Sequence, residues 1–166
     1  MNRGDVVAEH EPRRDRFIKE HIHDPYRIRM KPEAPVDCPR CGAVFDGGRW
    51  SWSDHPPAGA DHEVCPACRR IADNCPAGII TIEGPFAEAH REEILGLLNN
   101  EAAAEAREHP LNRLLSTARH DGGMTVATTD LHLARRLGEA LHRAFQGDLS
   151  LRYGEEEYLL RVHWTR

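Results

Sequence analysis

The sequence has no long apolar run and few aromatic residues. No stretch of its 166 residues approaches the roughly 18 uninterrupted apolar residues of a membrane helix. The opening residues, MNRGDVVAEHEPRRDRF, have no apolar core of the kind found in a secretory signal. We therefore expect a cytoplasmic protein that does not engage a membrane. With 40% hydrophobic and 30% charged residues, the composition is typical of a folded globular chain.

The sequence also has none of the short motifs that mark common catalytic sites. It has no GxxxxGK[ST] loop to hold a nucleotide phosphate, no GxSxG turn and no HExxH helix. We therefore expect no nucleotide cofactor and no catalytic residues, and we interpret the chain as non-enzymatic. An enzyme of unknown class is the third choice, because no pairing of a nucleophile with a base is visible.

Positive charge is scarce outside the N-terminal segment. The net charge is −5, and only residues 1–31, with eight Lys/Arg against six Asp/Glu, are basic. Residues 32–75 carry four Lys/Arg against seven Asp/Glu. Because non-specific binding to phosphate needs several unopposed cations, any contact with a nucleic acid should be local and dependent on shape.

Four of the five cysteines form two pairs, C-P-R-C-G and C-P-A-C-R-R, with 23 residues between them. Two CxxC pairs at such a separation are typical of zinc sites, since zinc prefers four soft ligands in a tetrahedron. The spacing predicts one structural Zn²⁺ bound by Cys38, Cys41, Cys65 and Cys68. A thioredoxin-like redox site needs a single CxxC after a buried strand, and a catalytic zinc needs an open position that four thiolates do not leave.

The fifth cysteine and the neighbouring histidines have simpler interpretations. Cys75 lies about two helical turns past Cys68, which is too far to share the metal, so we expect a free, partly buried thiol. His55 and His62 lie between the two pairs, and either could replace a cysteine ligand. Surface histidines in a loop are the commoner explanation.

The chain divides into three segments. Residues 1–35 have little periodicity and indicate a partly disordered tail, in which residues 13–24 could form a short helix against a partner. Residues 36–76 form the cysteine module, where Gly42 permits a left-handed turn and the second cysteine pair opens a helix. A knuckle, a hairpin and a helix that carries the last ligands make up a treble-clef or zinc-ribbon module.

Residues 77–166 alternate strand and helix patterns, and we refer to them as the α/β domain. The last helix, Leu131–Phe145, has the clearest apolar stripe and is capped by Thr129 or Asp130. The other expected elements are strands at 78–83 and 124–128, helices at 85–99 and 101–109 with a break at Asn99–Asn100, a strand at 111–119 with helix as its competitor, and a hairpin of 149–153 with 158–164. The order is that of a split βαβ (ferredoxin-like) sheet with one added strand, so the fold class is α+β.

Arginines alternate with aromatic residues around the cysteine pairs. Aromatic rings can stack on exposed bases while arginines pair with phosphates or base edges. The candidate contact residues for RNA or a ribonucleoprotein are Arg40, Arg49, Trp50, Trp52, Arg69 and Arg70. In the simpler interpretation the tryptophans pack over the zinc knuckle, and we expect one of them to do so. The alternative function is that of a protein–protein adaptor, which recruits its partner through the tail and through a sheet edge near Tyr158–Trp164.

A series of motifs resembles those of a bacterial family of small zinc-binding proteins of unassigned function. The series is CPRCG, GRWSW, CPACRRIADNCPAG, GPF, HREEI, EHPLNRL, TTDLHLARRLGEAL, GDLSLRY and RVHW. The cysteine pairs and the LARRLGEAL helix are more remotely similar to the N-terminal zinc region of the archaeal and eukaryotic adaptor for export of the large ribosomal subunit. The resemblance implies a ribosome-associated or RNA-associated role, and it implies that the four paired cysteines bind zinc.

Overall fold

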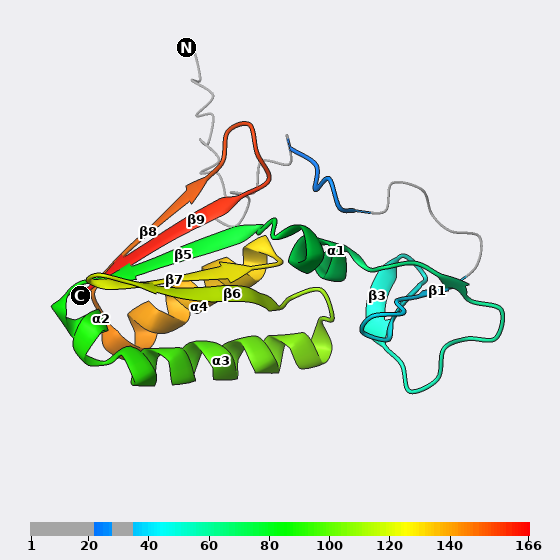
Figure 1. The fold of residues 1–166 in the computed structure, drawn as a ribbon, viewed down its shortest axis with the longest axis horizontal. Coiled ribbons are helices and arrows are strands. Elements are labelled where there is room, and N and C mark those ends of the chain that lie inside the picture. Colours follow the sequence, from blue (N-terminus) through cyan, green and yellow to red (C-terminus); the bar gives the residue numbers. More distant parts are fainter. Residues whose placement is uncertain (1–21, 28–34) are drawn as a thin grey trace, which may run out of the picture.

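The computed structural model describes residues 22–27 and 35–166 and contains two mixed sheets and four helices (Figure 1). The α+β class is therefore confirmed. The elements of the cysteine module are β1 (Val36–Asp37), β2 (Ala43–Asp46), β3 (Arg49–Trp52), β4 (Asp61–His62) and α1 (Pro66–Asp73). Those of the α/β domain are β5 (Gly78–Glu83), α2 (Pro85–Ala89), α3 (Arg91–Glu108), β6 (Leu114–His120), β7 (Gly123–Thr128), α4 (Leu131–Phe145), β8 (Asp148–Tyr153) and β9 (Leu160–Thr165).

The small sheet of the cysteine module has the order β3-β2-β1-β4. Strands β2 and β3 form a hairpin around Gly47 and Gly48, both of which have positive φ, as a tight two-residue turn requires. Phe45 lies opposite Trp50 in this hairpin, and their rings are 5.5 Å apart. The hairpin that the sequence predicted in the module is therefore present, with both tryptophans on its second strand.

The larger sheet has the order β6-β7-β5-β9-β8. β7 lies antiparallel between β5 and β6, so the chain passes from β5 through α3 to a strand two places away. β9 runs parallel to β5 and pairs with β8 on its other side. The edge strands of the sheet are therefore β6 and β8.

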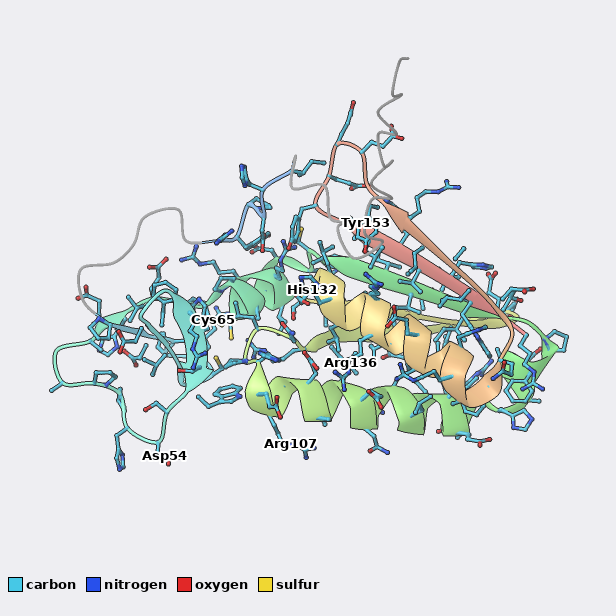
Figure 2. The ribbon with its side chains drawn as sticks, turned by 180° about the vertical axis from the view of Figure 1, so that it is seen from behind. Asp54, Cys65, Arg107, His132, Arg136 and Tyr153 are labelled. Atoms are coloured by element: carbon cyan, nitrogen blue, oxygen red, sulfur yellow. The ribbon has the colours of Figure 1, made fainter. Side chains whose placement is uncertain are left out.

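One face of this sheet is covered by helices and holds the main core. Figures 1 and 2 show α4 running along the sheet with α3 beside it. Alternate residues of β5 are buried, and Ile80, Ile82 and Val162 face the helices together with Trp164. Asp130 caps α4, because its carboxylate accepts a hydrogen bond from the Leu133 N–H at 3.0 Å, as the sequence predicted.

Two expectations for the α/β domain are wrong. The helix does not break at Asn99–Asn100, since α3 is continuous from 91 to 108 and the break falls earlier, at His90. Leu98 and Ala102 are both buried and continue the apolar stripe across the exposed asparagines, and a single Asn costs a helix only about 0.7 kcal/mol. Nor is the segment near Tyr158–Trp164 a sheet edge, because β9 lies between two strands.

The described residues 22–27 lie against the cysteine module. Tyr26 donates a hydrogen bond from its hydroxyl to Asp73 at 2.8 Å, and Asp24 accepts one from Arg70 at 2.6 Å. The helix expected at residues 13–24 falls largely outside the described residues. Among the helices of the described part of the chain, none combines the length and apolarity of a membrane span.

Candidate metal centre

The sulfur atoms of the four paired cysteines converge on one point. All four lie within 4.8 Å of one another, and Cys41 Sγ is 3.7 Å from Cys65 Sγ. Four sulfurs held about 2.3 Å from a tetrahedral zinc would be about 3.8 Å apart. No disulfide joins them, and Cys38, Cys65 and Cys68 are buried. The donor set and its spacing therefore fit a metal ion that prefers thiolates.

The first cysteine pair is presented by a tight turn between β1 and β2. The Gly42 N–H donates to the Cys38 carbonyl at 2.8 Å, and the Cys38 N–H donates to the Ala43 carbonyl at 2.8 Å. Gly42 has φ of 78°, the left-handed conformation that the sequence predicted for it. The turn places both thiols on the side that faces the second pair.

The second pair opens helix α1. Cys65 is the N-cap, and its sulfur accepts a hydrogen bond from the Cys68 N–H at 3.4 Å. Pro66 follows in the first turn, where its missing N–H costs nothing. The Cys65 N–H in turn donates to Cys38 Sγ at 3.3 Å, which links the two pairs directly. The positive end of the helix dipole thus faces the sulfur cluster.

Burial raises the pKa of these thiols, and backbone N–H donors lower it. Burial by itself raises the pKa of Cys38, but N–H groups of Cys65, Arg40 and Cys41 outweigh it and lower the pKa to about 7. Burial dominates at Cys65 and raises its pKa, and charge on Cys41 and Cys38 adds to the increase. Burial also raises the pKa of Cys41. Four thiolates cannot share this space unless a cation offsets their charge.

Arg113 belongs to no motif that would predict a site residue, yet its guanidinium points at the sulfur cluster. Its Nη2 lies 3.3 Å from Cys68 Sγ, 3.4 Å from Cys65 Sγ and 4.0 Å from Cys41 Sγ. Burial lowers the pKa of Arg113, but its hydrogen bond to Cys68 and the neighbouring thiolates outweigh this effect and raise it. The guanidinium therefore offsets part of the negative charge of the cluster.

The backbone of Arg113 is fixed by the loop between β7 and α4. Its N–H donates to Thr129 Oγ1 at 2.9 Å, and the Thr129 N–H donates back to the Arg113 carbonyl at 2.9 Å. The Thr129 hydroxyl also donates to the Leu111 carbonyl at 2.6 Å. These hydrogen bonds hold the backbone of Arg113 in place, and its guanidinium lies beside the cysteine sulfurs.

The cysteine module also rests on the end of α3. Trp52 donates from its indole N–H to the Ala106 carbonyl at 2.7 Å, and Leu111 packs against the cysteine cluster. Figure 2 shows Cys65 in the module, close to the end of α3 that carries Arg107. The candidate centre therefore lies where the module meets the α/β domain.

The candidate contact residues do not form one exposed surface. Arg40 and Arg49 are exposed, and Trp52 is 42% exposed. Trp50 is half-buried and packs against the cysteine cluster, which is the role expected for one of the two tryptophans. Arg69 forms an ion pair with Glu63.

Arg70 is placed differently from the other candidates. It is 2% exposed and donates hydrogen bonds to Asp24 at 2.6 Å and to the Cys75 carbonyl at 3.0 Å. Its guanidinium lies 4.4 Å from the centre of the Tyr26 ring and 5.5 Å from that of Tyr158. The residue therefore joins the 22–27 segment to α1 and to the β8–β9 loop, and offers no surface to a nucleic acid.

Cys75 and His62 lie outside the cysteine cluster. Cys75 is a free thiol, but it is exposed rather than partly buried, because it follows the end of α1 instead of packing under it. The His62 ring forms a hydrogen bond with the Asp37 carboxylate, and the His62 side chain is 73% exposed. Among residues 22–27 and 35–166, the four paired cysteines are the group of side chains that could hold a metal ion.

Comparison of the chain with protein-family models, with curated proteins and with solved structures found no match in any of the three.

Proposed function

We propose that this chain is a non-enzymatic zinc protein that docks on RNA or on a ribonucleoprotein. The convergence of four sulfurs within 4.8 Å carries the metal part of the proposal. Four thiolates fill a tetrahedron and leave no position for substrate or water, so the zinc is structural. The turn at the first pair and the helix at the second support a treble-clef arrangement, and the β6-β7-β5 order supports a split βαβ sheet.

In this proposal the metal gives the module its shape and anchors it to the α/β domain. The buried cluster around the sulfurs contains Cys38, Cys65, Ala67 and Cys68, and the small sheet adds the buried side chains of Val36, Ala43 and Val44. This is too little apolar surface to hold a fold by itself. Arg113 and Trp52 connect that cluster and its hairpin to the α/β domain. The zinc therefore fixes the position of the outer hairpin and the knuckle relative to the larger domain.

The outer surface of the module supplies the proposed contacts with RNA. Arg40 lies in the knuckle and Arg49 begins β3, and both are exposed. Trp52 exposes part of its ring at the end of the same strand, where an unpaired base could stack on it. Because residues 32–75 have an acidic balance, these few cations would make a local contact. The resemblance to the export adaptor of the large ribosomal subunit supports the same assignment.

Sedimentation of the protein with ribosomal subunits at two salt concentrations, with and without RNase, tests this proposal. We expect co-sedimentation that RNase abolishes and that weakens as salt rises, because released counterions drive the contact. The double variant Arg40→Ala/Arg49→Ala should lower the salt slope by up to about 2, if each arginine contacts one phosphate.

The matched control is Arg143→Ala, which removes one exposed arginine from α4, away from the module. It should bind as the unmodified protein does. Protein partners that remain bound after RNase treatment would instead support the alternative function, that of a protein–protein adaptor. If the double variant Arg40→Ala/Arg49→Ala binds the subunits as tightly as the unmodified protein does, the proposed contact surface is wrong.

A further inference from the structure

Strand β8 is an edge strand with an undistorted ladder. It pairs with β9 in continuous register from Asp148 to Tyr153. Within the described ranges no strand pairs with its outer side, and Figure 1 shows it at the rim of the sheet. The opposite edge, β6, has a register shift between Leu114 and Ser116. Because bulges of this kind protect an edge from pairing, β8 is the edge better suited to receive another strand.

The side chains of β8 alternate between apolar and polar along its length. Leu149 lies opposite Trp164, and Leu151 lies opposite Val162, so both leucines share the face that the helices cover. Leu151 is nevertheless 38% exposed, since it stands at the rim. Asp148, Ser150 and Arg152 share the other face and are exposed.

We propose that two copies of this chain pair through β8, antiparallel, with Ser150 opposite Ser150. In this register Asp148 of each copy lies opposite Arg152 of the other, which gives two ion pairs on the polar face. Leu149 of each copy lies opposite Leu151 of the other, so the exposed Leu151 of both copies is covered. Residues directly opposite in an antiparallel pair share a face with Cβ atoms about 4.5–5.5 Å apart, so both kinds of pair are in contact.

The existing neighbour of Arg152 provides a separate argument for this register. Arg152 lies directly opposite Arg161 of β9, and like charges in that position destabilise a sheet. Arg161 has a carboxylate partner in Glu157, at 2.7 Å. The Asp148 carboxylate of the second copy would provide one for Arg152. The five residues from Asp148 to Arg152 are thus self-complementary in charge and in apolar character.

The expected dimer is weak and depends on concentration. One strand pair buries less than the roughly 1,200 Å² at which stable interfaces begin. The pairing would extend the two sheets into one and place both helix layers on the same side. It does not use the cysteine module, so the dimer does not depend on the proposed zinc or RNA contacts.

Charge reversal at the two ends of the five-residue stretch tests the register. In sedimentation velocity on the full chain, the average mass should rise toward that of a dimer as the protein concentration increases from roughly 10 µM to 1 mM. Asp148→Arg places two arginines opposite each other in the homodimer, and Arg152→Asp places two aspartates opposite each other. Each single variant should self-associate at least about tenfold more weakly, since two attractive pairs become repulsive.

The two variants mixed in equal amounts should form a heterodimer, because every pair between them is again of opposite charge. The double variant Asp148→Arg/Arg152→Asp should recover self-association for the same reason. The control is Glu88→Arg, an equal charge change at an exposed position of α2, and it should associate as the unmodified chain does. A monomer throughout the series, single variants that associate normally, or a mixture that stays monomeric would overturn the proposal.

Discussion

The α/β domain and the cysteine module differ in what fills their interiors. The core of the α/β domain is an extensive cluster of apolar side chains from the strands and from helices α2, α3 and α4, with Leu137 and Trp164 fully buried in it. The module buries far less apolar surface: three cysteines and Ala67 around the sulfurs, and Val36, Ala43 and Val44 in the small sheet. The hydrophobic effect at about 25 cal/mol per Å² of buried apolar surface can hold the first together but not the second. The proposed metal ion would therefore take the place of a large core in the segment that is too short to build one.

Removal of the metal should have the largest effect, and it should be confined to the module. Structural zinc contributes about 10–16 kcal/mol in small zinc-dependent peptides, so Cys65→Ser or a strong chelator should unfold residues 36–76. The three tryptophans report on the two regions separately, since Trp50 and Trp52 lie in the module and Trp164 in the larger core. We expect the indole N–H resonances of the first two to collapse and that of Trp164 to persist, together with loss of one bound zinc per chain.

The matched control for this experiment is Cys75→Ser, because Cys75 is a free thiol outside the cluster. It should retain full metal content and all three resonances. Three unchanged indole resonances after complete metal removal would show that the module has a stabilising element besides the cysteine centre.

A cavity in the larger core should have the next largest effect. Leu137→Ala removes a fully buried side chain from α4, and such changes cost about 2–5 kcal/mol. Denaturant unfolding should show this loss, while the metal content of the folded protein stays at one per chain. Ile71→Ala, at a position that is 41% exposed, should stay within about 0.5 kcal/mol of the unmodified protein. Loss of metal in folded Leu137→Ala protein would mean that the two regions fold as one unit.

Substitution of Arg113 tests the connection between the two regions. Its effect on metal affinity should be smaller than the loss of stability expected for Leu137→Ala. Arg113→Ala removes the cation that faces three sulfurs, and partners of metal ligands typically contribute about 10–100-fold to metal affinity. Competition with a chromogenic chelator should show a loss in that range, about 1.4–2.7 kcal/mol. Arg113→Lys should recover part of it, since lysine restores the charge but not the planar fork.

Arg119→Ala is the control for this variant, because Arg119 lies on β6, which follows Arg113 directly, and pairs with Glu92 at the surface. The cobalt-substituted Arg113→Ala protein should keep the absorption of a tetrahedral thiolate site, which separates weaker binding from a changed set of ligands. Equal metal affinity in the alanine variant and the unmodified chain would show that the guanidinium does not act on the metal.

Local sequence signals predicted much of the module and several elements of the α/β domain. The cysteine spacing predicted the cluster, and Gly42 has the predicted left-handed conformation. The pattern of Leu131–Phe145 predicted α4 with its observed bounds, and β5 lies at the predicted residues 78–83. The break predicted at Asn99–Asn100 was wrong, because burial of the flanking face outweighs the weak helix propensity of asparagine.

What the sequence by itself determined is therefore local: two thiols brought together by a four-residue turn, and stripes of apolar residues that fix helices and strands. The tertiary structure alone decided that Arg113, 72 residues beyond Cys41, would face the sulfurs. It also decided that β9 would lie inside the sheet and leave β8 at its edge. No spacing along the chain encodes these placements, because they depend on how whole elements pack around a shared core, and a residue's neighbours in space are then set by the path of the chain.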